Sequence, residues 1–140
     1  MWRWIFLSNS GKRLWTGTWG VMLVMTLFLG LWPLSAPVAS TGWDKSDHLV
    51  GFAALTMTGM WMLPAQSRAR VWLWLGLLLL GGLIEVLQMF IPMRQGDLWD
   101  WLADAIGVGM GAAVGYAVLR WVSPPGTVAH SGSADDPHWP

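Results

Sequence analysis

Four long apolar segments constrain this chain more than any other feature of its sequence. They run over about 18–37, 48–64, 71–91 and 101–122, and the first contains no charged residue. A helix needs about 20 mainly apolar residues to cross the roughly 30 Å hydrocarbon core of a bilayer. Because backbone polar groups must be satisfied inside the lipid, such segments cross it as helices. Their hydrophobicity is continuous rather than alternating, which argues against a β-barrel.

The shortage of charge points the same way and excludes several classes of protein. Only 11% of the residues are charged and 54% are hydrophobic, whereas a soluble domain has roughly 25% charged residues. A wholly disordered chain is excluded, since such chains are rich in charge. The absence of cysteine excludes disulfide scaffolds and Cys-ligated zinc, and a net charge of zero provides no global field for nucleic acid. The composition predicts a small polytopic membrane protein.

The second segment is the shortest of the four. Its roughly 17 residues, with a rise of about 1.5 Å each, reach about 25 Å, which is less than the hydrocarbon core. Either the polar residues of 44–48, at the start of this helix, are drawn slightly into the membrane, or the bilayer thins there, and we expect the first.

The distribution of Lys and Arg predicts the orientation of the bundle. One side of the predicted membrane domain has six of these residues and the other side has two. The six are Arg3, Lys12, Arg13, Arg68, Arg70 and Arg120, and the two are Lys45 and Arg94. Because positively charged loops stay in the cytoplasm, we predict an all-α, four-helix transmembrane bundle with both termini inside (N-in/C-in).

Three parts follow from this topology. Residues 1–17 form a cytoplasmic or interfacial arm, 18–122 the membrane domain, and 123–140 a cytoplasmic tail whose Pro, Gly and Ser content predicts disorder. The first segment has basic residues before it, as a signal peptide would. Its apolar stretch exceeds the roughly 7–15 residues usual in signal peptides, so we expect it to be retained.

The acidic residues converge on the outer side of the predicted bundle. Six of the eight lie before the second and fourth segments or near the outer ends of the third and fourth. They are Asp44, Asp47, Glu85, Asp97, Asp100 and Asp104, and Lys45, His48, Gln88 and Arg94 lie among them. This convergence predicts one polar pocket that faces away from the cytoplasm.

Helical spacing supports a shared pocket. Asp44 and His48 are four residues apart, and Glu85 and Gln88 are three apart, so each pair lies on one helix face. The stripe of Asp97, Asp100 and Asp104 continues through Gly107, Gly111 and Gly115. Small residues allow helices to approach closely in lipid, so we expect this face to turn inward. It also offers a surface for a homo-oligomer.

Individual side chains keep alternative roles. A charged acid in the bilayer costs on the order of a few kcal/mol, so Glu85 is either a neutral group that fixes helix register or an ionisable functional group. His48 is a general base, a ligand or an interfacial cap. Arg94 either binds a phosphate or carboxylate or pairs with one of the acids. One available histidine, with no HxxxH motif, predicts no metal site, and no motif predicts a cofactor.

Three short motifs resemble a known family. DKSDHLVGF at 44–52 resembles the DKxxHxxxF opening of the VanZ-like family. EVLQ at 85–88, followed by Pro92 and Arg94, resembles its ExxQxFxPxR block, and DWLADAIG at 100–107 resembles its DxxaNxxG segment. The three occur in the family's order over roughly half of the chain. Asp104 stands where the family often has Asn, and Asp97 where Ser is common.

This resemblance implies a small multi-pass protein of the bacterial cytoplasmic (inner) membrane. The family is named after a protein associated with low-level teicoplanin resistance, and its biochemical mechanism is not established. The resemblance therefore implies a location and a class of phenotype, altered glycopeptide susceptibility, rather than a reaction.

Three functions from different classes fit these residues. The first is binding of an anionic envelope molecule, such as a lipid-linked precursor or a phospholipid headgroup. Its candidate binding residues are Asp44, Lys45, His48, Glu85, Gln88, Arg94, Asp100 and Asp104. The second is an enzyme on the same substrates, with His48, Glu85 or Asp100 in acid–base catalysis. The third is a small proton- or ion-coupled carrier that uses Glu85 and Asp104.

Overall fold

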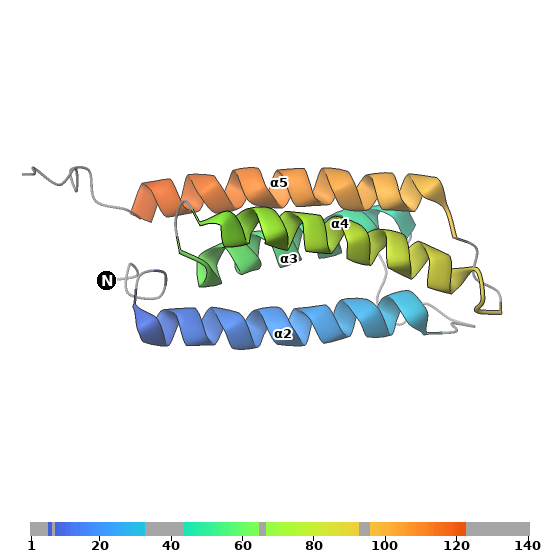
Figure 1. Ribbon diagram of the computed structural model, residues 1–140, viewed down its shortest axis with the longest axis horizontal. Coiled ribbons are helices and arrows are strands. Elements are labelled where there is room, and N and C mark those ends of the chain that lie inside the picture. Colours follow the sequence, from blue (N-terminus) through green and yellow to red (C-terminus); the bar gives the residue numbers. More distant parts are fainter. Residues whose placement is uncertain (1–5, 7, 33–43, 65–66, 93–95, 123–140) are drawn as a thin grey trace, which may run out of the picture.

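The described part of the chain is all-helical, which confirms the all-α part of the predicted fold. The computed structural model describes residues 6, 8–32, 44–64, 67–92 and 96–122. Its helices run alternately up and down (Figure 1). They are α2 (Asn9–Leu31), α3 (Asp44–Met62), α4 (Arg68–Gln88) and α5 (Leu98–Val122).

Three of these helices, α2, α4 and α5, are long and apolar enough to cross a membrane by length and composition. The helix that corresponds to the second predicted span, α3, is not among them. Its first turn carries Lys45 and Asp47, and its mean hydropathy is lowered further by threonine and glycine. The crossing of α3 stays a prediction, whereas the membrane character of the chain rests on the other three.

The helix boundaries differ from the predicted segments for local reasons. α2 begins at Asn9 rather than near residue 18, because the Ser8 side chain caps it and accepts a hydrogen bond from the Gly11 amide at 2.9 Å. It ends at Leu31, two residues before Pro33, which cannot continue a helix. α3 begins at Asp44, so its first residue and His48 do share a helix, as the spacing requires.

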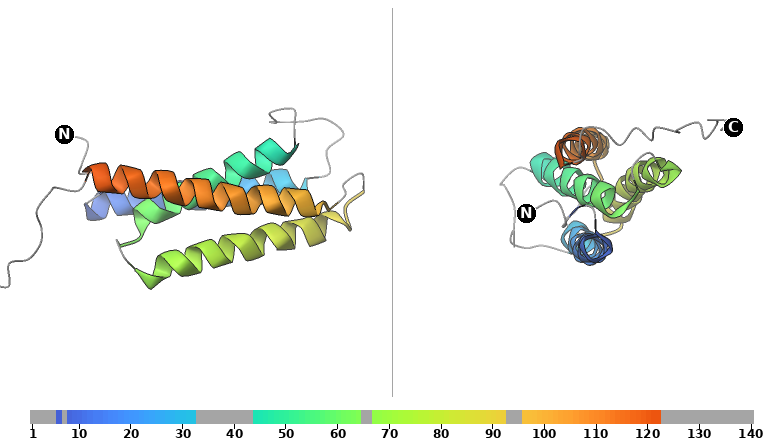
Figure 2. Two further views of the ribbon diagram at one scale, coloured as in Figure 1. Left: turned by 90° about the horizontal axis from the view of Figure 1, so that it is seen from above. Right: turned by 90° about the vertical axis from the view of Figure 1, so that its left-hand side faces the viewer.

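The least apolar helix, α3, occupies the centre of the bundle. It contacts α2, α4 and α5, and it packs most extensively on α5. The end-on view of Figure 2 shows α3 lying between α5 and α2, with α4 on a third side. A helix enclosed by protein needs less apolar surface than one that faces lipid, which explains why the central helix has the weakest spanning signal.

The predicted glycine stripe packs against α3. A Cβ atom at Gly107 would collide with the Leu49 carbonyl, and one at Gly111 would collide with the Ala53 carbonyl. Gly115 faces α3 one turn further along the same stripe. The predicted close packing is therefore confirmed. Since α3 of the same chain covers this face, a second copy has no access to it in this arrangement.

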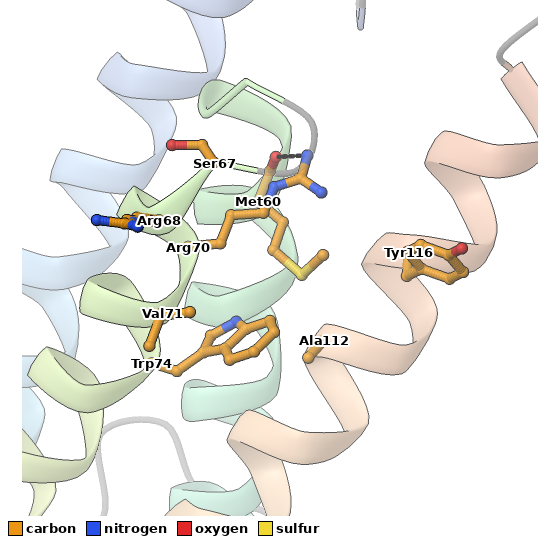
Figure 3. Close-up of a pocket in the computed structure, with 8 residues that line it drawn as sticks. All are labelled: Met60, Ser67, Arg68, Arg70, Val71, Trp74, Ala112 and Tyr116. Carbon is orange, nitrogen blue, oxygen red and sulfur yellow. Dashed lines mark hydrogen bonds between the residues drawn. The ribbon is translucent and has the colours of Figure 1, made fainter. Parts of the chain in front are cut away.

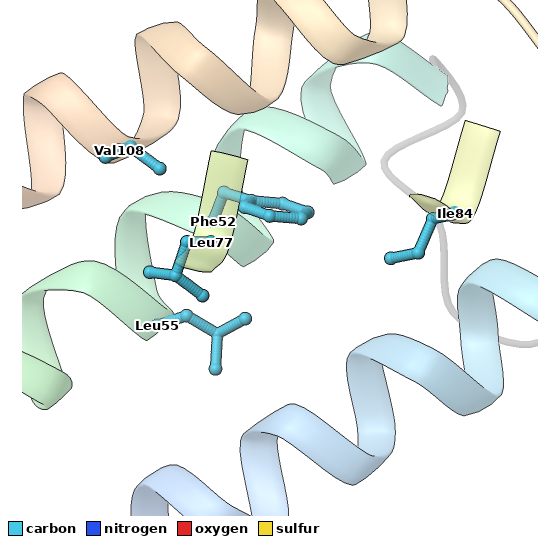
Figure 4. Packing of buried hydrophobic residues seen from close by; sticks show 5 residues of the cluster. All are labelled: Phe52, Leu55, Leu77, Ile84 and Val108. Carbon is cyan, nitrogen blue, oxygen red and sulfur yellow. The ribbon is translucent and has the colours of Figure 1, made fainter. Parts of the chain in front are cut away.

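A small apolar core joins α3, α4 and α5. Phe52 and Leu55 from α3, Leu77 and Ile84 from α4, and Val108 from α5 are all buried together (Figure 4). The outer faces are apolar as well, and Leu79 of α4, for example, is 76% exposed. Exposed aliphatic side chains on every side are what lipid-facing helices require.

The alternating helix directions divide the charges between two ends of the bundle. The start of α2, the start of α4 and the end of α5 share one end (Figure 1). We call it the basic end, and its residues are Lys12, Arg13, Arg68, Arg70 and Arg120. The opposite end, the acidic end, brings together the start of α3, the end of α4 and the start of α5.

Candidate functional site

Six polar side chains from α3, α4, α5 and the residue before α5 form a cluster at the acidic end. We call them the polar cluster: Lys45, His48, Glu85, Asp97, Asp100 and Asp104. They come from sequence positions up to 59 residues apart, from 45 to 104, and they meet only because α3, α4 and α5 alternate in direction. The convergence predicted from the sequence is present among these six residues.

Lys45 lies between two aspartates. Its Nζ is 2.6 Å from Asp97 Oδ2 and 2.7 Å from Asp100 Oδ1. Asp100 is almost fully buried, whereas the Lys45 and Asp97 side chains are partly exposed. The hydrogen bonds that Lys45 donates to Asp100 and Asp97 raise the pKa of Lys45, and the bond to Asp97 lowers the pKa of that aspartate below its ordinary value of 3.8.

His48 contacts two buried carboxyl groups. Its Nδ1 is 2.9 Å from Asp104 Oδ1 and 3.7 Å from Glu85 Oε1. The Asp104 side chain is fully buried, and those of His48 and Glu85 are 9% and 10% exposed. This arrangement holds the imidazole ring between α4 and α5, with its orientation fixed chiefly by Asp104.

Gly81 of α4 makes room for the Asp104 carboxyl group. A Cβ atom at Gly81 would collide with Asp104 Oδ2 and lie 3.2 Å from its Cβ. The residue therefore belongs to the support of the site, although it has no polar side chain. Sequence reasoning missed it; the only available signal was the Gly81-Gly82 pair inside an otherwise leucine-rich segment.

Glu85 links the end of α4 to the start of α5. Its Oε2 accepts a hydrogen bond from the Asp97 amide at 2.8 Å, and the Asp97 side chain in turn accepts one from the Trp99 amide at 2.9 Å. Within the described residues, Glu85 Oε1 and Asp104 Oδ2 are buried and have no hydrogen-bond partner. Two carboxyl oxygens therefore keep unused hydrogen-bonding capacity inside the bundle.

The remaining predicted site residues lie elsewhere. The side-chain nitrogen Nε2 of Gln88 donates a hydrogen bond to the Gly30 carbonyl at 2.9 Å, so this contact links α4 to α2. Arg94 lies outside the described residues, as does the side chain of Asp44. The sequence therefore identified the cluster but not its pairing, because which carboxylate meets Lys45 or His48 depends on helix rotation.

Three members of the polar cluster are also close enough to hold a metal ion. One ring nitrogen of His48 and one carboxylate oxygen each from Glu85 and Asp100 lie within 4.8 Å of one another. Imidazole and carboxylate ligands suit divalent metals. The sequence predicted no metal site, because these three ligands lie on different helices and form no linear motif.

The His48–Asp104 pair has the geometry of an oriented base. A carboxylate hydrogen-bonded to Nδ1 fixes the ring tautomer and stabilises the imidazolium form, which leaves Nε2 for proton transfer. The neighbouring Glu85 adds a second group able to donate or accept a proton. No family model, no curated protein and no solved structure matches this chain.

Proposed function

We propose that this chain is a multi-pass bacterial inner-membrane protein of the VanZ-like type. Its polar cluster binds the anionic headgroup of a lipid-linked envelope molecule or phospholipid. His48, oriented by Asp104, then acts as a general acid–base catalyst on the bound molecule. The observation that carries this proposal is the 2.9 Å contact of His48 Nδ1 with the fully buried Asp104, beside Glu85 at 3.7 Å.

The burial of three ionisable groups supports a functional role. Each acidic side chain placed within a membrane costs about 2.5 kcal/mol or more. Leucine at these positions would pack without that cost, and a structural hydrogen bond would need no carboxyl group. Glu85 and Asp104 also retain buried oxygens without a partner in the described chain, which is typical of a site rather than of a finished structural network.

The motif residues support the family resemblance. Lys45 and His48 come from the first motif, Glu85 from the second, and Asp100 and Asp104 from the third. All five belong to the polar cluster, although the three motifs are separated by long apolar stretches. A single site built from all three motifs explains why the chain contains all of them better than three separate structural roles do.

The charge distribution supports an outward-facing site. Among the described residues, five of the six Lys and Arg residues lie at the basic end, and only Lys45 lies at the acidic end. The positive-inside rule then assigns the basic end to the cytoplasm. The polar cluster faces outward under this assignment, where headgroups of lipid-linked precursors and of the outer leaflet are within reach.

Lys45 supports recognition of an anionic headgroup. Its ammonium group has three donors, and the described residues engage two of them through Asp97 and Asp100. The side chain is 32% exposed. A phosphate oxygen therefore takes the third donor without displacing either aspartate.

The test is turnover of lipid-linked and phospholipid substrates by the purified full-length protein in detergent. We expect His48→Gln to lower turnover about 100-fold, in the range of general acid–base catalysis, with substrate binding little changed. Asp104→Asn keeps an acceptor for Nδ1 but loses the charge, so about a tenfold loss is expected, and Asp104→Leu should match His48→Gln. Asp136→Asn, in the segment after α5, is the control.

The same variants distinguish the alternatives. Headgroup binding that depends on Lys45 and Arg94, with no turnover by any variant, would make the protein a binding protein. A proton- or ion-coupled carrier, favoured by the unpartnered oxygens of Glu85 and Asp104, would instead show transport in vesicles that Glu85→Gln abolishes. If Glu85→Gln, His48→Ala and Arg94→Ala are all silent for envelope phenotype in expressed protein, the pocket has no function.

A further inference from the structure

A groove lies at the basic end, remote from the polar cluster. It has a volume of about 430 Å³ and is bounded by α3, α4 and α5. Figure 3 shows Trp74 of α4 turned toward Ala112 of α5, with Arg70 above it and Tyr116 further along α5. Its walls are mainly apolar, and its basic residues, Arg68 and Arg70, lie in the first turn of α4.

Arg70 is fixed at the top of this groove. It is 8% exposed, and its Nη2 donates to the carbonyls of Met60 and Leu63 at 3.1 Å and 3.3 Å. These carbonyls lie at the end of α3, where helix carbonyls have no partner within the helix. The guanidinium group therefore has a defined position, and its positive charge is retained where the groove begins.

Two buried donors in the groove have no acceptor. Arg70 Nε and Trp74 Nε1 are inaccessible to solvent, and no described residue accepts a hydrogen bond from either. A buried donor left unpaired costs about 1–3 kcal/mol. Both residues lie on α4, four positions apart, so both face the same side of that helix. Both donors belong to residues that line the groove, so the groove has a polar, positively charged side as well as apolar walls. This combination suits a ligand that carries both an anionic group and an acyl chain.

We propose that this groove binds an anionic phospholipid of the leaflet at the basic end. The acyl chain lies along Val71, Trp74 and Ala112, while the phosphate pairs with the exposed Arg68, two positions from the fixed guanidinium group of Arg70. Basic pockets between membrane helices near the cytoplasmic side are known to favour anionic headgroups. Free phosphate would leave the apolar walls unused.

The surroundings of the groove favour lipid over a protein partner. Val71 and Tyr116 on its rim are 49% and 56% exposed. The neighbouring outer face of α4 carries Leu75 and Leu79, which are 45% and 76% exposed and are suited to acyl chains. Because Arg68 begins α4, its side chain lies at the level of headgroups when that helix spans the membrane.

The test is lipid binding by the full-length protein in detergent, measured by native mass spectrometry and by thermal unfolding. Phosphatidylglycerol and phosphatidylcholine with the same acyl chains are compared, with inorganic phosphate as a third arm. We expect phosphatidylglycerol to bind about tenfold more tightly than phosphatidylcholine and to raise the melting temperature, whereas inorganic phosphate does neither.

Two pairs of variants test separately the contribution of the apolar groove and the contribution of its positive charge to lipid binding. Ala112→Phe fills the groove and should remove lipid binding, whereas Ala113→Phe, next to it on the exposed side of α5, should not. Arg68→Gln should lower the preference for phosphatidylglycerol about threefold or more, whereas Arg120→Gln, also at the basic end but outside the groove, should leave it unchanged. Equal binding of both lipids, or equal effects within each pair, overturns the proposal. Arg68 is exposed, so its variant tests the proposal even if Ala112→Phe fails to fold.

Discussion

The sequence predicted which residues belong to the polar cluster, but it did not predict which side chains within the cluster contact one another. The predicted outer pocket contained Lys45, His48, Glu85 and Asp100, and all four lie in the cluster. Periodicity gives the helix face of a residue but not the rotation of one helix against the next. For that reason the pairing of His48 with Asp104 was not predictable, although both residues were candidates.

Gly81 provides a direct test of how Asp104 is positioned. Gly81→Ala places a methyl group against the Asp104 carboxyl group, so we expect a loss of about 1–3 kcal/mol in stability from overpacking, together with loss of site function. Gly76→Ala on the same helix has nothing within 4 Å of the added atom and is the matched control. Its expected effect is neutral or slightly stabilising. Thermal unfolding in detergent measures both, and an equal response of the two variants would contradict the packing.

The Lys45–Asp97 pair predicts a pH dependence of stability. Because Lys45 lowers the pKa of Asp97 below 3.8, this aspartate stabilises the folded state at pH values above 3.8 and loses that contribution as the pH falls through its lowered pKa. Because Asp100 and Asp97 raise the pKa of Lys45 above 10.5, the lysine stabilises the fold below pH 10.5 and loses its contribution only at higher pH.

Lys45→Met should remove both effects. We expect its melting temperature to vary less than that of the original chain between pH 5 and pH 3, with Lys12→Met as a control from the basic end. The pH values are chosen about one unit on either side of the ordinary Asp97 pKa of 3.8. Parallel acid profiles for Lys45→Met and the original chain would show that the ion pair contributes nothing in solution.

At the scale of the helices, hydrophobicity predicted where they are but not how they are arranged. All four apolar segments correspond to helices, since a long apolar run has no other stable form in lipid. The helix α2 begins before the predicted apolar segment, because the cap at Ser8 brings residues 9–17 into the same helix. The central position of α3 was not predictable either, because the hydropathy of one segment does not show which other helices pack against it.

The contact between α3 and α5 yields an element-scale prediction. Gly107→Ala and Gly111→Ala both place a methyl group against the α3 backbone, so each should destabilise the bundle by about 1–3 kcal/mol. Gly109→Ala lies on the same helix with nothing within 4 Å and should be tolerated. Thermal unfolding in detergent provides the comparison. If Gly109→Ala destabilises as much as the other two, the effect comes from the helix itself rather than from its packing on α3.

For the whole molecule, the separation of charges predicts the orientation in the membrane. The chain contains no cysteine, so single cysteines can be introduced without a background. Leu98 lies at the acidic end and is 74% exposed. A Leu98→Cys variant should therefore react with an impermeant thiol reagent added to intact cells. Trp121→Cys, at the basic end and 88% exposed, should react only after permeabilisation. The reverse pattern would invert the topology and place the polar cluster in the cytoplasm.

The central position of α3 has a consequence for biosynthesis. The chain is made from its N-terminus, and α3 emerges before α4 and α5, although its polar first turn makes it the described helix least able to enter lipid alone. Its most extensive partner, α5, is synthesised only after α4. A chain that stops after α4 therefore leaves the surface of α3 that packs against Gly107 and Gly111 without its partner.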